Sequence, residues 1–299
     1  MCDWADTMAG DEGVTHAAAV AQLLANDFQG AEERLRADVR ASPWHALLFA
    51  QIAFARAVLS LAPGDAEDAL QRCWDADAVA NEAGPQGGGV MSALFGAGAA
   101  EEQDVAAGLE QQLVKADAHL MGAVMQLLLG RYIRAGLNFR NGWNLYHAAA
   151  ATLESTPEAV PPELKCIIDF GIGMFNLIAS LLPSTYLAVA EYIGFGGNRA
   201  DAKRLLARSY QADATWSPFP ALLLLYFYTQ LAPNLGIFSL RDRAEVEAIL
   251  ASSVAQQHRG SALFLWMEGM AARLYARDPK VRPPPPTPNP QPPARTRHP

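Results

Sequence analysis

The chain has 299 residues, of which 51% are hydrophobic and 18% are charged, and its formal net charge is −8. This length suits one large domain or two smaller ones, and the acidic balance excludes a broad nucleic-acid-binding face. Alanine is abundant and β-branched residues are sparse, which favours helices. Three distant cysteines, Cys2, Cys73 and Cys166, lack metal-site spacing and predict reduced thiols.

The N-terminal part predicts helices arranged in pairs. Residues 1–14 are acidic, match no secretory signal, and are expected to be disordered. Residues 15–83 show helical periodicity over four ranges, 15–27, 31–40, 44–61 and 66–83. Ser42 followed by Pro43 is a start signal for the third of these helices. We therefore expect two antiparallel helix pairs.

These pairs are similar to tetratricopeptide units, in which two helices are joined by a short turn. The turn at residues 26–31 places Phe28 three positions before Ala31, a spacing found in such repeats. Residues 130–135 repeat it with Tyr132 and Ala135. The fold class predicted is all-α, with helix pairs stacked as a tetratricopeptide-like α-solenoid.

The main helical domain is expected at residues 101–278, after a flexible glycine-rich connection at 84–100. Its first helices are predicted at about 101–129 and 133–153. Three arginines, Arg131, Arg134 and Arg140, form a local basic cluster there. One interpretation is solvated charge paired with Glu101 or Glu102. The other is a site for an anion or an acidic peptide.

Residues 169–198 carry no charge between Asp169 and Glu191. They predict two apolar helices with a corner at Pro183 and Ser184, and a glycine-rich exit turn at 194–198. The favoured interpretation is a buried helix pair at the centre of the domain. The alternative is a membrane-seeking hairpin, because a helix kinked at Pro183 could approach the roughly 20 apolar residues of a membrane span.

The C-terminal third predicts helices at about 199–211, 219–231, 244–255 and 261–276. The last one is amphipathic and lacks a partner helix, so Phe264 and Trp266 are expected to be half covered. Residues 279–299 are proline-rich and should be disordered with polyproline II character. We expect either a truncated gene or splice form, or a surface that awaits a partner.

No catalytic or cofactor-binding constellation is present in the sequence. The histidines at 16, 45, 119, 147 and 258 are isolated along the chain, and no spacing suits zinc. The glycine-rich run at 194–199 lacks the lysine and the preceding strand of a phosphate loop, so it predicts a helix stop. No cofactor, metal or enzymatic activity is expected.

Several stretches resemble the tetratricopeptide repeat protein 39 / inclusion-body-clearance family. The similarity covers roughly residues 15–279, including 115–149, 219–233 and 261–279. It is strongest in F-G-x-G-x-F-N-L, S-L-L-P and G-F-G-G-N. The matching residues are Gly130, Arg131, Tyr132, Phe170, Gly171, Gly173, Phe175, Asn176, Leu177, Ser180, Leu181, Leu182, Pro183, Gly194, Phe195, Gly196, Gly197 and Asn198.

The resemblance implies an all-helical, non-enzymatic adaptor. It also implies a link to protein-inclusion clearance, to lipid droplets and to the mitochondrial outer membrane. The usual family chain is about twice as long, with a C-terminal repeat array that the proline-rich tail replaces here.

The sequence therefore predicts a non-catalytic scaffold that binds other proteins, with no nucleic acid as partner. The candidate partner surface comprises Arg131, Arg134, Arg140, Phe264 and Trp266. The predicted location is cytoplasmic, with the mitochondrial outer membrane or the lipid-droplet surface as the alternative. A protein anchored to a membrane or lipid droplet through residues 170–240 is the second hypothesis.

Overall fold

The computed structural model describes residues 11–83, 98–181, 197–239 and 242–276, and these residues form helices and turns with no β-strand among them. This confirms the all-α prediction. The elements are α2 Asp11–Leu24, α3 Phe28–Leu35, α4 Pro43–Ser60, α5 Pro63–Glu82, α6 Gly98–Leu128, α7 Tyr132–Ser155, α8 Pro162–Ala179, α10 Arg199–Tyr210, α11 Pro218–Tyr226, the π-helix η2 Phe227–Leu231, α12 Ala232–Asn234, α13 Asp242–Ala251, α14 Ser253–Gln257 and α15 Ala262–Ala276.

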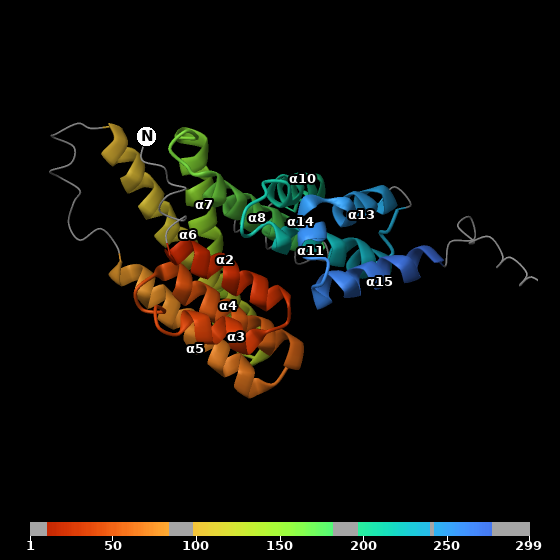
Figure 1. Ribbon diagram of the computed structural model, residues 1–299, viewed down its shortest axis with the longest axis horizontal. Helices are drawn as coiled ribbons and strands as arrows, with labels where there is room; N and C mark the ends of the chain where they lie inside the picture. Colours follow the sequence, from red (N-terminus) through yellow and green to blue (C-terminus); the bar gives the residue numbers. More distant parts are fainter. Residues whose placement is uncertain (1–10, 84–97, 182–196, 240–241, 277–299) are drawn as a thin grey trace, which may run out of the picture.

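Consecutive helices pack in adjacent pairs, as in a helical solenoid. The pairs are α2 with α3, α4 with α5, α6 with α7, and α8 with α10. In Figure 1, α2–α7 occupy one half of the molecule and α10–α15 the other, with α8 between them. Each pair buries its apolar faces against neighbouring helices, as in other helical-repeat proteins.

The turns at residues 26–31 and 130–135, which have similar sequences, also have the same backbone geometry. Asn26 and Gly130 both adopt left-handed backbone conformations, with φ of 67° and 71°. Beyond each of them the chain closes the same hydrogen bond back to the preceding helix, from Asp27 N to Gln22 O at 2.9 Å and from Arg131 N to Gln126 O at 2.7 Å. This is the Schellman ending, which satisfies helix carbonyls and reverses the chain toward the next helix.

Two large clusters of buried side chains hold the stack together. The first joins α4–α8 and includes Leu47, Leu113, Tyr146 and Phe175. The second joins the end of α8 to α10–α15 and includes Leu177. The helix α8 belongs to both clusters, so it connects the two halves of the molecule.

The glycines of the motif F-G-x-G explain how α8 fits between its neighbours. A Cβ atom on Gly171 would lie 2.0 Å from Cε1 of Tyr146 on α7. One on Gly173 would lie 2.9 Å from Cγ of Leu206 on α10. Any larger residue would force these helices apart, because buried ring and branched side chains occupy the space.

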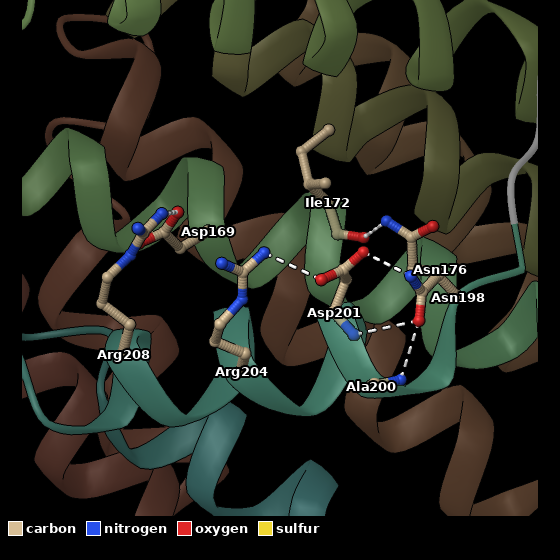
Figure 2. A network of polar contacts seen from close by, with 8 residues as sticks. All are labelled: Asp169, Ile172, Asn176, Asn198, Ala200, Asp201, Arg204 and Arg208. Carbon is tan, nitrogen blue, oxygen red and sulfur yellow. Dashed lines mark hydrogen bonds and ion pairs between the residues drawn. The ribbon is translucent and has the colours of Figure 1, made fainter.

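Polar contacts fix α8 against α10, as Figure 2 shows. Arg208 of α10 makes a two-pronged ion pair with the buried carboxylate of Asp169 on α8, which raises the pKa of the arginine. Asn198 caps α10, because its Oδ1 accepts from Ala200 N at 3.0 Å and from Asp201 N at 3.2 Å. The Asp169–Arg208 pair therefore joins the apolar helix α8 to the charged helix α10.

Most apolar side chains of α8, α11 and η2 are buried against other helices. Leu177, Leu224 and Phe227 are buried in the second cluster. Within the described ranges, no helix is long and apolar enough to cross a membrane. The predicted corner at Pro183 and the exit turn through residue 196 lie outside the described residues.

Some element boundaries differ from those predicted. The helix predicted at 244–255 is two helices, α13 and α14, because Ser252 ends the first and caps the second by accepting from Ala255 N at 3.3 Å. The predicted helix 31–40 ends at Leu35 and continues as turns. Residues 84–97 of the predicted glycine-rich connection lie outside the described residues, and α6 begins at Gly98.

Candidate functional site

The first half of α7 presents large apolar side chains to solvent. Tyr132, Ile133 and Leu137 are 70%, 84% and 60% exposed. The buried positions of α7 are Ala135, Gly142, Trp143, Tyr146 and Ala149. Exposed apolar clusters on a folded protein mark interaction sites.

The same surface is basic. We call Arg131, Tyr132, Ile133, Arg134, Leu137 and Arg140 together the α7 face. Of its arginines, Arg131 contacts Glu67 of α5 at 3.4 Å, and both of these side chains are exposed, so the pair contributes little stability. No described residue forms an ion pair with the other two arginines. The side chains of Glu101 and Glu102, the predicted partners, lie outside the described residues.

The two predicted partner residues on α15 lie in different environments. Trp266 is 48% exposed, and its ring lies 6.3 Å from the ring of Tyr226. Phe264, predicted to be half covered, is only 3% exposed. It is stacked on His258 of the turn after α14, with 6.3 Å between the ring centroids. Phe264 therefore belongs to the core, because the turn before α15 folds back over it.

A cavity of about 380 Å³ lies where α4, α6, α8 and the segment before α11 converge. This volume is within the range of small-molecule sites. It is lined by Leu23, Leu24, Asn26, Phe28, Gln51, Phe54, Ala55, Val58, Leu59, Asp117, Leu120, Met121, Val124, Phe139, Phe170, Met174, Phe175, Ile178, Trp216, Phe219, Ala262 and Leu263. We call it the central cavity.

The central cavity has few polar groups. Asp117 of α6 is the one ionisable side chain among its described lining residues. Its Oδ1 accepts a hydrogen bond from the hydroxyl of Tyr146, and burial raises its pKa from an ordinary value of 3.8 to about 6. Gln51 of α4 contributes an amide whose buried Oε1 has no hydrogen-bond partner among the described residues.

Asp117 and Gln51 were not predicted as site residues from the sequence. A signal for Asp117 was present, because it lies four residues after Leu113 and four before Met121. That spacing places the carboxylate within the apolar stripe of α6. Nothing in the sequence alone shows that the surrounding helices leave a space beside it.

Two histidines that are distant in sequence come together in the fold. The rings of His16 on α2 and His45 on α4 are stacked with 6.3 Å between centroids, and Trp216 lies 5.4 Å from His16. Burial lowers the pKa of His16 to about 3, so its ring is neutral. Within the described ranges, no three His, Cys, Asp or Glu side chains are grouped as metal ligands.

The family-motif residues have structural positions in the described part of the chain. Gly130 makes the turn before α7, Phe170 lines the central cavity, and Phe175 packs 4.8 Å from Trp143. Asn176 Nδ2 donates to Ile172 O at 3.0 Å. Gly197 directly precedes the α10 cap. Pro183, Gly194 and Phe195 lie outside the described residues.

Stacked helix pairs with an exposed, basic and apolar face define a helical-repeat protein of the type that binds other proteins. The family description Iml2/Tetratricopeptide repeat protein 39 matches residues 17–277, and the chain therefore belongs to this family. The resemblance noted from the motifs is confirmed. No solved structure matches the chain.

Proposed function

We propose that this protein is a non-catalytic scaffold whose α7 face binds a partner protein. The observation that carries the proposal is the exposure of Tyr132, Ile133 and Leu137 beside arginines. Aromatic residues and arginine are enriched at protein interfaces, and a central apolar patch with a charged rim is a common arrangement. Two arginines that form no ion pair with any described residue favour a partner that presents carboxylates.

The test compares partner capture by two matched variants. The first is Ile133→Ser with Leu137→Ser, which removes apolar contact from the α7 face. The second is Leu235→Ser with Leu265→Ser, which removes similar side chains from exposed positions elsewhere. Both should fold normally, because exposed substitutions of this kind change stability little.

Partners are purified with each form and quantified by mass spectrometry at equal bait amounts. The α7-face variant should lose its main partners about tenfold or more, the scale of an interface hot spot. The control should retain them. Equal recovery of those partners by the wild type and the α7-face variant would sink the proposal.

We further propose that this scaffold acts in the clearance of protein inclusions. Family membership supports this role. In cells that lack the protein, the wild type should lower the number of inclusions, and the Ile133→Ser/Leu137→Ser variant should not. Equal clearance by both would show that inclusion clearance does not depend on the α7 face.

We propose a cytoplasmic location, with recruitment to the lipid-droplet or mitochondrial surface as the alternative. Support comes from the family resemblance and from burial of the apolar side chains in α8 and α11 against other helices. Flotation of cell lysates on a density gradient distinguishes the two locations. Co-flotation with droplets or sedimentation with mitochondria would replace the cytoplasmic assignment.

A further inference from the structure

The central cavity is a pocket and not a packing defect, because it opens to the surface at Val58, Leu59 and Ile178, which are 42%, 65% and 42% exposed. Protein interiors are close-packed, and voids larger than one water molecule are few. At about 380 Å³ this cavity could hold a drug-sized molecule. Its aliphatic and aromatic lining offers water few hydrogen-bonding partners, so ordered water is a poor occupant.

The polar groups of the cavity determine which functional group a ligand must place beside them. Asp117 receives one hydrogen bond, at Oδ1 from Tyr146, and no described residue donates to its Oδ2. Gln51 adds a second acceptor, the buried Oε1 to which no residue of the described ranges donates. Each of these oxygens accepts hydrogen bonds, so a ligand group that meets either one must donate.

The charge of the cavity selects among donors. No Lys, Arg or His is among the described lining residues, so the Asp117 carboxylate has no cation beside it there. Asp117 is partly buried, and a carboxylate that loses water without gaining a counter-charge is unfavourable, so a ligand cation would stabilise it. The rings of Phe139, Phe170 and Phe175 also line the cavity, and aromatic faces attract ammonium groups.

We propose that the central cavity binds a lipophilic amine, with its hydrocarbon body among the aromatic and aliphatic side chains and its ammonium group at Asp117. The same lining disfavours a fatty acid, because two carboxylates would meet without a cation between them. The site is separate from the α7 face, so this inference stands or fails independently of the proposed scaffold role.

The experiment uses three probes with the same hydrocarbon chain, which are decylamine, decanol and decanoate. Each is titrated calorimetrically into the full-length protein at neutral pH. The amine should bind about tenfold or more tightly than the alcohol, as expected for a close charge pair. Decanoate should bind most weakly. Comparable binding of decanoate and decylamine, or no binding of any probe, would overturn the proposal.

Two variants locate the site. Asp117→Asn should bring the amine to within about twofold of the alcohol, because the charge pair is lost while the apolar lining remains. Asp38→Asn is the matched control, since Asp38 is exposed and outside the cavity, and it should leave all affinities unchanged. Val124→Phe should weaken amine and alcohol alike by filling the cavity. Unaltered amine preference in a folded Asp117→Asn protein would refute the assignment.

Discussion

Single residues determine how closely the helices of this fold can pack. The sequence identified Gly171 and Gly173 as family motif residues, but the reason for the glycines appears only in three dimensions. Each glycine faces a different neighbouring helix at a distance that no Cβ atom could occupy without displacing the neighbour. Asp117 and Gln51, in contrast, were not predicted as site residues. A polar residue on an apolar stripe can be recognised as a ligand contact only when the cavity beside it is known.

Asp117 should make stability depend on pH in a defined direction. Its pKa is about 6 in the folded chain and about 3.9 in an unfolded one, so the folded state binds more protons between these values. Stability from this group is therefore lost as pH rises from about 4 to above 6. Facing it are Tyr146 and Cys73, both neutral here because their pKa values are raised, and uncharged lining residues of α4 and α8.

The measurement is urea unfolding of the wild type and Asp117→Asn across this pH range. The unfolding free energy of the variant minus that of the wild type should increase by about 3 kcal/mol between about pH 4 and pH 7. This follows from a pKa difference of about two units, each worth about 1.4 kcal/mol. Other titrating groups cancel in the difference. A constant difference across the range would contradict the assigned pKa.

At the scale of elements, the starts of helices and the turns between them were predictable from the sequence. Breaks and irregular turns within helices were not. Ser42 caps α4 as predicted, since its side chain accepts from His45 N. The break at Ser252 and the π-helical stretch η2 were missed, because apolar periodicity continues through both. The boundary between core and surface on α15 also escaped prediction, because it depends on how α14 packs.

The contact between α7 and α8 gives an element-scale prediction. Gly171→Ala should lower the unfolding free energy by about 2 kcal/mol, because the new methyl group collides with the buried ring of Tyr146. Gly108→Ala on α6 is the control, since a Cβ atom added there would meet no other atom within 4 Å. It should raise stability by about 0.5–1 kcal/mol through helix propensity. Urea denaturation followed by circular dichroism measures both, and equal effects of the same sign would refute this account.

At the scale of the whole molecule, the family and the all-α stack were predictable from sequence motifs and helical periodicity. The two surfaces that support function were predictable to different degrees. The arginines of the α7 face were visible in the sequence, but the exposure of Ile133 and Leu137 was not. The central cavity was not predictable, because it forms between helices that are far apart along the chain.

Amide hydrogen exchange on the purified complex with a captured partner tests the scaffold claim most directly. Residues 132–141 should exchange more slowly in the complex than in the free protein, because a bound partner covers the exposed side of α7 and restrains its local opening. Unchanged exchange over these residues, with slowing confined to other helices, would contradict the claim that the α7 face is the binding surface.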